Sequence, residues 1–277
     1  MRLRELSIIG LGLIGGSAAL AARKADAADR INGWDHDPET LAAALSARLL
    51  DVAADSVAEA SKNAALILIA APVHAIPALV LESAQFCPAA CAITDTGSVK
   101  AAIHQALKNA VPNFVGSHPL AGSEKSGHRH ASANLFEGRT VVLTRGADCG
   151  PAAFEQVSSF WERIGARIVT MDALEHDQIL ARTSHLPHFV AAALTLVARR
   201  DPRNLIGTGF GDTTRIAAGN AALWTDIALT NREPVLAAMS DCEGELRSVR
   251  SALERNDRDW IYQWLLQAKQ RRDDLGN

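Results

Sequence analysis

The first half of the chain alternates short apolar runs with alanine-rich or amphipathic segments. The apolar runs predict strands, and the early segments between them predict helices at Ser17–Lys24, at Thr40–Ala47 and from about Ala75. The expected strands are Leu6–Gly10, Arg30–Trp34, Ala65–Ala70, Cys91–Asp95, Phe114–Gly116, Thr140–Leu143 and Arg167–Met171. A run as continuously apolar as Ala65–Ala70 is typical of a parallel sheet covered on both faces. The pattern therefore predicts an α/β domain with a Rossmann-type doubly wound sheet.

The second half is helical from about Leu174 almost to the end. This change predicts an α/β domain over residues 1–173 and an all-α C-terminal domain over residues 174–277. Within the helical part, apolar side chains in steps of three and four form one stripe, at Met239, Cys242, Leu246, Val249 and Leu253. Two interpretations stay open, intramolecular packing and a helical surface that forms a homodimer. Asp259 is expected to cap a last helix.

Composition narrows the class of protein. The 277 residues carry 28 basic and 31 acidic side chains, a net charge of −3, with no block of one sign. A nucleic-acid surface is therefore not expected. The longest apolar stretch, Ala64–Val73, is too short to cross a membrane, and no secretory signal is visible. Four cysteines without CxxC spacing are typical of reduced thiols. These features favour a cytoplasmic enzyme.

A glycine-rich turn follows the first expected strand and opens a helix. Its GxGxxG spacing is given by Gly10, Gly12 and Gly15, with Leu13 and Ile14 between the last two. The first glycine permits the tight turn, the second lets the backbone approach a pyrophosphate, and the third lets the helix pack closely on the strand. The helix N-terminus offers N–H groups and a positive dipole to the phosphates. We expect a dinucleotide here.

The ends of the following strands extend this cofactor site. Asp35, directly after the second strand, is placed to accept hydrogen bonds from the adenosine ribose and to repel a 2′-phosphate. This favours NAD over NADP. Ligands of open sheets bind at the carboxyl ends of the strands, so two further strand exits are expected to contact the cofactor, at Ala71 and Pro72 and at Thr96 and Gly97.

The segment Gly116–Gly127 resembles the HPxxGxExSG signature of the prephenate and arogenate dehydrogenases. Further blocks of similarity follow in family order, at Gly10–Ser17, Asp95–Lys100, Thr183–His188, Gly209–Ala217, Trp224–Ile227 and Asn231-Arg232. The resemblance covers nearly the whole chain. It implies NAD-dependent oxidative decarboxylation of prephenate to 4-hydroxyphenylpyruvate in tyrosine biosynthesis. L-arogenate, which would give tyrosine directly, stays open as an alternative or second substrate.

The resemblance also implies catalytic roles. His118 would accept the proton of the ring 4-hydroxyl as hydride leaves C4, which suits a side chain that is largely neutral near pH 7. Ser98 resembles the family serine that touches both this histidine and the substrate, although it could instead cap a helix over Val99–Leu107. Glu124 resembles a glutamate near the mouth of the active site.

Substrate contacts are implied farther along the chain. Arg215 matches the family arginine that grips a substrate carboxylate; a surface ion pair with Asp212 is the alternative. Trp224 resembles a tryptophan of the pocket, with a core position as the alternative. Three further residues are expected to lie at the start of a helix, namely Ser184, His185 and His188. The two histidines are three residues apart and share one helix face. Hydrogen bonding to the substrate is favoured over metal binding for this group.

Two positions depart from the family pattern. A basic residue usually precedes Asp212, where this chain has Gly211, and Thr208 stands where glycine is common. The resemblance therefore implies fewer carboxylate contacts from this loop. Two other classes of protein fit the sequence less well. A β-hydroxyacid dehydrogenase would need a lysine on a helix of the second domain, but Leu174–Ala198 has none. A non-catalytic NAD-binding sensor would have no reason to retain His118, Ser98 and Arg215 together.

Overall fold

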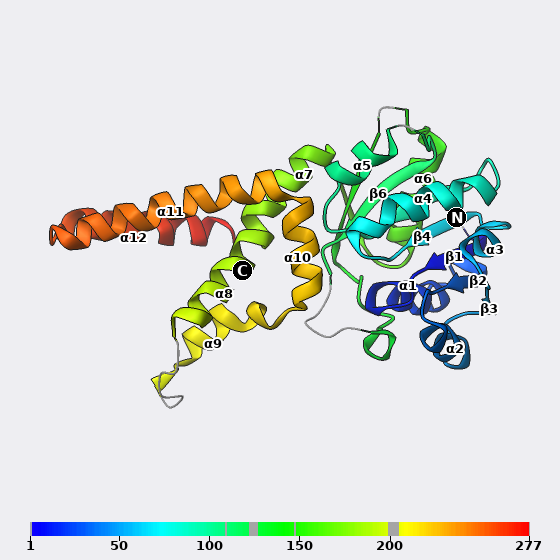
Figure 1. The fold of residues 1–277 in the computed structure, drawn as a ribbon, viewed down its shortest axis with the longest axis horizontal. Helices are drawn as coiled ribbons and strands as arrows, with labels where there is room; N and C mark the ends of the chain where they lie inside the picture. The colour runs from blue at the N-terminus through cyan, green and yellow to red at the C-terminus, as the bar shows by residue number, and fades with distance from the viewer. Residues whose placement is uncertain (1, 109, 122–126, 147, 199–204, 277) are drawn as a thin grey trace. The chain divides into compact units, whose positions relative to one another are not determined.

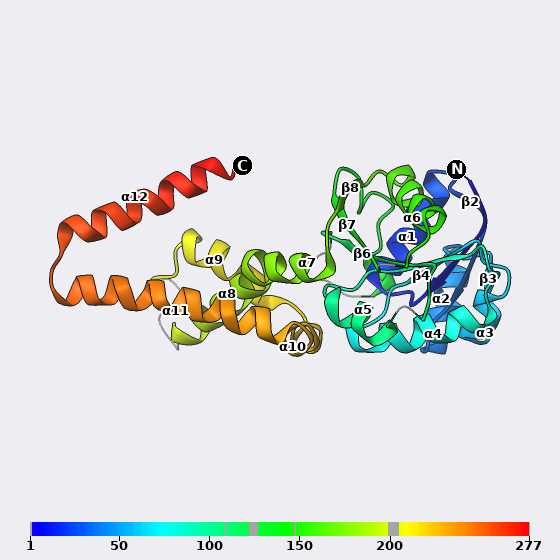
Figure 2. The ribbon, with the colours of Figure 1, turned by 90° about the horizontal axis from the view of Figure 1, so that it is seen from above.

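The protein is described by a computed structural model that covers residues 2–108, 110–121, 127–146, 148–198 and 205–276 (Figures 1 and 2). The chain divides into two compact units, one up to Arg232 and one from Glu233. The first unit holds the sheet and the helices up to α10, and the second holds the long helices near the C-terminus. No helix among the described residues is long and apolar enough to cross a membrane.

An eight-stranded sheet in the order β3-β2-β1-β4-β5-β6-β7-β8 forms the centre of the first unit. The strands are β1 (Leu3–Ile9), β2 (Ala28–Trp34), β3 (Val52–Ala53), β4 (Leu66–Ile69), β5 (Ala92–Asp95), β6 (Phe114–Pro119), β7 (Thr140–Arg145) and β8 (Arg167–Thr170). The Rossmann-type α/β fold is thus confirmed. The expectation of a wholly parallel sheet is wrong at one point, since β7 pairs antiparallel with β6. An antiparallel neighbour needs no crossover helix, and the chain between these strands forms only the short 3-10 turn η2 (His128–His130) among its described residues.

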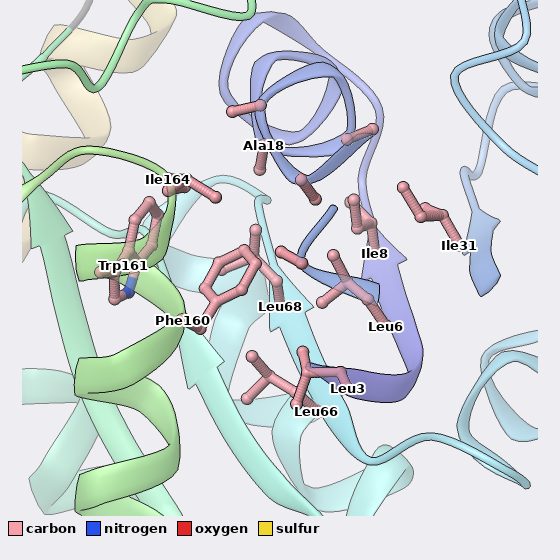
Figure 3. Packing of buried hydrophobic residues seen from close by; sticks show 14 of the residues in the cluster. Leu3, Leu6, Ile8, Ala18, Ile31, Leu66, Leu68, Phe160, Trp161 and Ile164 are labelled. Carbon is pink, nitrogen blue, oxygen red and sulfur yellow. The ribbon is translucent and has the colours of Figure 1, made fainter. Parts of the chain in front are cut away.

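Helices cover both faces of the sheet. Successive residues of β4 point to opposite faces, so Leu66 and Leu68 enter one core cluster and Ile67 and Ile69 the other. The first cluster is closed by α1 (Leu13–Lys24) and α6 (Pro151–Arg163), whose Trp161 is fully buried (Figure 3). The second is closed by α3 (Val57–Ser61), α4 (Ile76–Phe86) and α5 (Ala101–Leu107). Beyond β2, α2 (Pro38–Ser46) is capped by Asp37. The η1 turn (Val73–Ala75) precedes α4.

The helical region begins with one continuous helix. It consists of α7 (Ala173–Leu180), a π-helical turn η3 (Ala181–His185) and α8 (Leu186–Val197). The expectation that a helix opens near Ser184 is therefore wrong. Pro187 would normally break a helix, because it lacks an N–H and its ring crowds the carbonyl four residues earlier. The wider π turn directly before it is one of the known ways to relieve such a conflict.

Shorter helices complete the first unit. They are α9 (Thr208–Thr214), the 3-10 turn η5 (Arg215–Ala218) and α10 (Ala221–Thr230), which Asn220 caps. The turn η5 packs against α8, and α10 packs against η1 at the exit of β4. His74 and Asp226 fasten this second contact, with 3.0 Å between Nδ1 and Oδ1. The exit of β4 and the helical region are therefore joined by specific contacts.

The second unit holds α11 (Arg232–Glu254) from Glu233 onward and α12 (Arg258–Asp274). Asp257, not Asp259, caps α12, because its carboxylate accepts from the N–H of Trp260 at 3.1 Å. The indole of Trp264 donates to Glu245 at 2.7 Å and so links the two helices. On α11 the apolar stripe leaves Leu246 and Leu253 about 60% exposed (59% and 60%).

Candidate functional site

The glycine turn has the backbone that its sequence predicts. Gly10 has φ of +93°, and a Cβ there would lie 2.3 Å from the Ala70 carbonyl oxygen. A Cβ on Gly15 would lie 1.9 Å from the Gly10 carbonyl oxygen, so helix and strand meet here in close contact. Around Gly12, by contrast, a Cβ would meet no described atom within 4 Å. The turn is thus closed where the fold needs glycine and open where a ligand would approach.

The start of α1 is available to an anion. The helix begins at Leu13, four residues earlier than expected, so Leu13 and Ile14 lie in its first turn. Its N-cap residue, Gly12, has no side chain to accept from the first N–H groups. These N–H groups and the helix dipole fit a pyrophosphate.

Asp35 lies beside the turn and holds it. One carboxylate oxygen accepts from the N–H of Leu11 at 2.7 Å, and the other accepts from the N–H of Asp37 at 3.0 Å. A carboxylate has about four acceptor positions, so lone pairs remain for ribose hydroxyls. The same side chain therefore shapes the turn and offers acceptors next to it.

The exits of β4 and β5 lie at the same edge of the sheet, because β1, β4 and β5 are parallel neighbours. After β4, Ala71 is half-buried and Pro72 is exposed. After β5, Thr96 is half-buried, and Gly97 is packed so closely that a Cβ would lie 2.8 Å from the Ile76 side chain. These residues border the edge at which the glycine turn lies.

His118 lies on β6, where a shorter strand ending at Gly116 was expected. The side chain is buried, with 8% exposure. Its Nδ1 lies 2.8 Å from Nε2 of His176. The pKa of His118 falls well below its ordinary value, chiefly through burial and further through the neighbouring His176, Lys100 and His185. The ring is therefore neutral over the physiological pH range.

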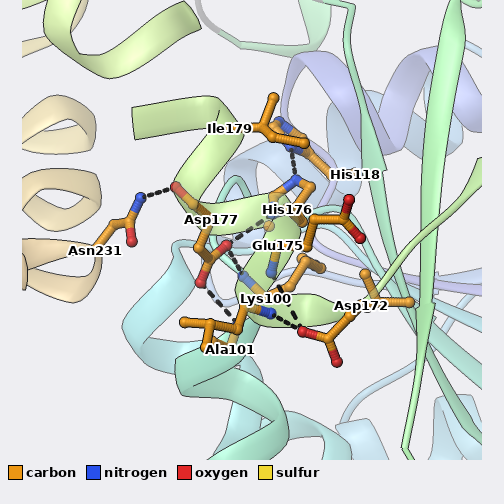
Figure 4. A network of polar contacts seen from close by, with 12 residues as sticks. Lys100, Ala101, His118, Asp172, Glu175, His176, Asp177, Ile179 and Asn231 are labelled. Atoms are coloured by element: carbon orange, nitrogen blue, oxygen red, sulfur yellow. Dashed lines mark hydrogen bonds and ion pairs between the residues drawn. The ribbon is translucent and has the colours of Figure 1, made fainter. Parts of the chain in front are cut away.

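Behind His118 stands a polar network from three elements (Figure 4). His176 and Asp177 lie on α7 and are buried, and Nδ1 of His176 is 2.7 Å from Oδ1 of Asp177. The Asp177 carboxylate also accepts from the N–H groups of Lys100 and Ala101, each at 2.8 Å. It thereby caps α5 from a distant part of the chain. Ser98 does not cap that helix, because α5 starts only at Ala101.

A buried ion pair fixes the strand ends beside this network. Lys100 is fully buried, and its ammonium group pairs with Asp95 and donates to the Ser117 carbonyl at 2.8 Å. Asp95 also accepts from the N–H groups of Gly97 and Ser117, at 2.8 and 3.0 Å. Burial lowers the pKa of Lys100, and the charge of Asp95 opposes this shift. The pair therefore holds the exit of β5 against the strand that carries His118.

Asn231 joins the network to the π turn. Its side-chain amide donates to the Asp177 carbonyl at 2.9 Å and lies 3.1 Å from Nδ1 of His185. An amide nitrogen only donates, so Nδ1 of His185 accepts and its proton lies on Nε2. Burial lowers the pKa of His185 to about 4, which agrees with a neutral ring. His185 therefore offers one N–H donor.

His185 and His188 both contact Trp224, which lies on α10. The rings of His188 and Trp224 stack with centroids 3.7 Å apart, and His185 meets Trp224 edge-on at 6.1 Å. Gly219 allows this stack, because a Cβ there would lie 2.5 Å from the indole nitrogen. Burial lowers the pKa of His188, whose buried Nδ1 has no hydrogen-bond partner among the described residues. A polar atom in that state is suited to a ligand.

The remaining expected residues are placed less specifically. Ser184 is half-buried in the π turn. Arg215 is exposed at the start of η5, and it forms no ion pair with Asp212 within the described chain. Ser98 lies after β5, one strand from His118, and the described residues contain no hydrogen bond between the two. Glu124 lies outside the described residues. The described part of the chain holds no group of three or more potential metal ligands.

The polar network behind His118 was not foreseen from the sequence. Its members are Lys100, His176, Asp177 and Asn231. An adjacent histidine and aspartate one turn into an expected helix are usually a solvated pair, and only the tertiary approach of α7 to β6 makes them partners of His118. Lys100 lies in the block Asp95–Lys100 that resembles the family, but its full burial, which requires a partner, appears only in the structure.

Comparisons with known proteins agree with this arrangement. Residues 18–170 match the family model "Prephenate dehydrogenase, nucleotide-binding domain", and residues 172–267 match "Prephenate dehydrogenase, dimerization domain". The chain is 35% identical to prephenate dehydrogenase of Bacillus subtilis, over 97% of this chain and 75% of that protein. It is 34% identical to cyclohexadienyl dehydrogenase of Zymomonas mobilis, over 97% and 95%. It is structurally similar to Aquifex aeolicus prephenate dehydrogenase solved with hydroxyphenyl propionate and NAD+, with a TM-score of 0.92, 30% identity and 99% of each chain covered.

Proposed function

Because the chain belongs to the prephenate dehydrogenase family, we propose that it oxidatively decarboxylates prephenate to 4-hydroxyphenylpyruvate with NAD, on the route to tyrosine. The observation that carries the proposal is the position of His118. This buried histidine lies at the sheet edge where the neighbouring parallel strands end, and β1 of that sheet leads into the glycine turn.

His118 is the proposed base. Its pKa is lowered by burial, so the ring can accept the proton of the substrate 4-hydroxyl near pH 7. Loss of that proton favours departure of hydride from C4, and the ring then becomes aromatic as its carboxylate leaves as CO2. We further propose that Ser98 orients the substrate hydroxyl and that Glu124 lies near the mouth of the site.

NAD would supply the hydride acceptor. The glycine turn fits its pyrophosphate, because Gly12 is open and the start of α1 is uncapped. Asp35 would accept from the ribose hydroxyls and disfavour a 2′-phosphate. The strand exits at Ala71 and Pro72 and at Thr96 and Gly97 would border the rest of the cofactor.

The helical region would bind the substrate. His185 offers an N–H donor and His188 an unpartnered ring nitrogen, and both contact Trp224. Such groups can bind the carboxylates and the flat ring of a cyclohexadienyl acid. Arg215 has no carboxylate partner within the described chain, which supports a role in holding a substrate carboxylate. Ser184 is a further candidate on the same π turn.

L-arogenate is the second candidate substrate. The relative from Zymomonas mobilis, of which the match covers 95%, carries the broader name cyclohexadienyl dehydrogenase. Prephenate and arogenate differ only in a keto or amino group on the side chain, so the chemistry at His118 would be the same for both.

At the level of the chain, we propose a homodimer formed by the C-terminal helices, in agreement with the match to a dimerization domain. We keep the proposed boundary between an NAD-binding domain, residues 1–173, and a helical substrate and dimerisation domain, residues 174–277. The two family models meet between residues 170 and 172. A cytoplasmic location is part of the proposal.

The test is the initial rate of NADH formation with prephenate and NAD, then with L-arogenate in its place. Turnover of either supports the reaction class, and the ratio of the two rates identifies the preferred substrate. His118→Asn should lower kcat by about 1,000-fold, within the usual range for a lost general base, while NAD binding persists. No turnover with either substrate, from folded protein that binds NAD, would refute the proposed function.

A further inference from the structure

Three buried side chains form one line of hydrogen bonds that ends on the proposed base. His118 on β6 meets His176 on α7 at 2.8 Å, and His176 meets Asp177 at 2.7 Å (Figure 4). We propose that His176 and Asp177 are positioning residues, which set the tautomer of His118 and hold the positive charge that arises when His118 takes a proton from the substrate. This inference rests on the proposed function, in which His118 is the base.

The direction of the line follows from Asp177. Both of its oxygens accept backbone N–H groups at the start of α5, so the carboxylate is the acceptor end. His176 therefore donates from Nδ1, and its bare Nε2 accepts from Nδ1–H of His118. A neutral imidazole carries a single N–H. Nε2 of His118 is thus left with a free lone pair, as a base requires.

The same line offers a place for the positive charge. When Nε2 of His118 takes the hydroxyl proton, its Nδ1 proton can pass to Nε2 of His176. His176 then carries a proton on each nitrogen and His118 is neutral again. One proton has entered and none has left, and the positive charge now lies against the Asp177 carboxylate.

The surroundings of His118 favour this transfer. Burial opposes a positive charge on its ring, and so do His176 on α7, Lys100 before α5 and His185 on the π turn. Asp95, on β5, is occupied by Lys100. Asp177, on α7, is the carboxylate that the ring of His118 reaches through one intermediate group. A base that must stay neutral before the reaction can therefore still accept a proton during it.

Two substitutions of His176 distinguish its role in fixing the tautomer of His118 from its role in taking up positive charge. His176→Leu removes the acceptor for His118 Nδ1 and should lower kcat on the order of 100-fold, in the range of general-base effects. His176→Gln places an amide oxygen near the same point, which can accept from Nδ1–H but cannot take up the proton. It should recover roughly 10-fold of the loss, because the tautomer is kept.

The pH profile of kcat/KM provides a second readout. In the wild type the added positive charge comes to lie on His176 beside the Asp177 carboxylate. In both variants the charge must stay on the buried ring of His118, which binds a proton less readily. The acid limb should therefore move to lower pH in both variants, by about one unit or more. A purely structural role for His176 would lower the rate at every pH and leave the acid limb in place.

His104→Leu is the matched control. His104 is a half-buried histidine of the same unit, whereas His176 is fully buried, and it bonds to Thr144 at 2.8 Å and not to His118. This variant should lose stability without a shift of the acid limb, and NAD affinity should be unchanged in all variants. A limb that moved equally in His104→Leu, or in none of the variants, would overturn the inference.

The tautomer can be measured without turnover. Ring nitrogen chemical shifts from 15N-labelled protein should show His118 protonated on Nδ1 in the wild type and mixed in His176→Leu. His118 protonated on Nε2 in the wild type would overturn the inference even if the enzyme is active. Absence of turnover combined with the expected tautomer would instead refute only the proposed function.

Discussion

At the residue scale, the site is organised by carboxylates that hold backbone N–H groups. Asp35 fixes the glycine turn, Asp95 fixes the exit of β5, and Asp177 caps α5. Each bond satisfies a buried donor that would otherwise cost about 1–3 kcal/mol. These acids therefore have structural duties as well as the chemical roles proposed for two of them, and substitutions must be interpreted with matched controls.

Asp35→Ala tests the cofactor site at this scale. Loss of the carboxylate should raise the Kd for NAD by about 10- to 100-fold, since a hydrogen bond to a charged group contributes about 1.5–3 kcal/mol. It should also reduce the preference for NAD over NADP, because repulsion of a 2′-phosphate is lost. Equilibrium binding of both dinucleotides measures the two effects.

Asp51→Ala is the control for that substitution. Asp51 likewise accepts a backbone N–H beside β2, that of Ile31 at 2.7 Å, but lies away from the glycine turn. It should lower the Tm and leave both dinucleotide affinities as they were. Equal losses of NAD affinity in the two variants would mean that Asp35 acts only through stability.

At the scale of elements, sequence patterns predicted the features that depend only on nearby residues. The apolar runs located the strands because buried strands need apolar residues. The glycine spacing located the turn because its backbone needs glycine. No residue pattern indicated that β7 is antiparallel or that a π turn precedes Pro187. Both depend on which segments meet in three dimensions, and the same holds for the partnership of His118 with His176.

Gly219→Ala tests the junction of η5 and α10. The added Cβ would lie 2.5 Å from the Trp224 indole nitrogen, so the stack on His188 must shift. KM for the substrate should rise several-fold, about 1 kcal/mol or more of lost binding, in line with the value of an aromatic pair. Initial rates at varied substrate and saturating NAD measure it.

Gly150→Ala serves as its control. A Cβ on this residue, which precedes α6, would meet no described atom within 4 Å. Its KM should match the wild type. An unchanged KM in Gly219→Ala would show that the Trp224 stack takes no part in substrate binding.

At the scale of the whole molecule, the apolar stripe of α11 is the surface that the proposed homodimer would cover. Leu246 and Leu253 lie on that stripe and are more than half exposed in the single chain. Exposed leucines at regular helical spacing favour association between copies.

Leu246→Glu combined with Leu253→Glu should therefore dissociate the dimer. Light scattering at micromolar concentration should give roughly twice the chain mass of 29.5 kDa for the wild type and about one chain mass for the variant. Arg247→Glu, which changes an exposed charge on the same helix, should remain dimeric. A wild-type protein of single-chain mass would refute the dimer.

The unbroken helix from Ala173 to Val197 has a mechanical consequence. It carries His176, which touches the proposed base, and His188, which stacks on Trp224, so one continuous helical segment with the π turn in its middle links both places. A substrate that binds beside Trp224 therefore contacts the same helical segment that holds His176. Truncated substrates that leave the Trp224 end empty should therefore react slowly even at saturation, because binding there would no longer be converted into alignment of the base.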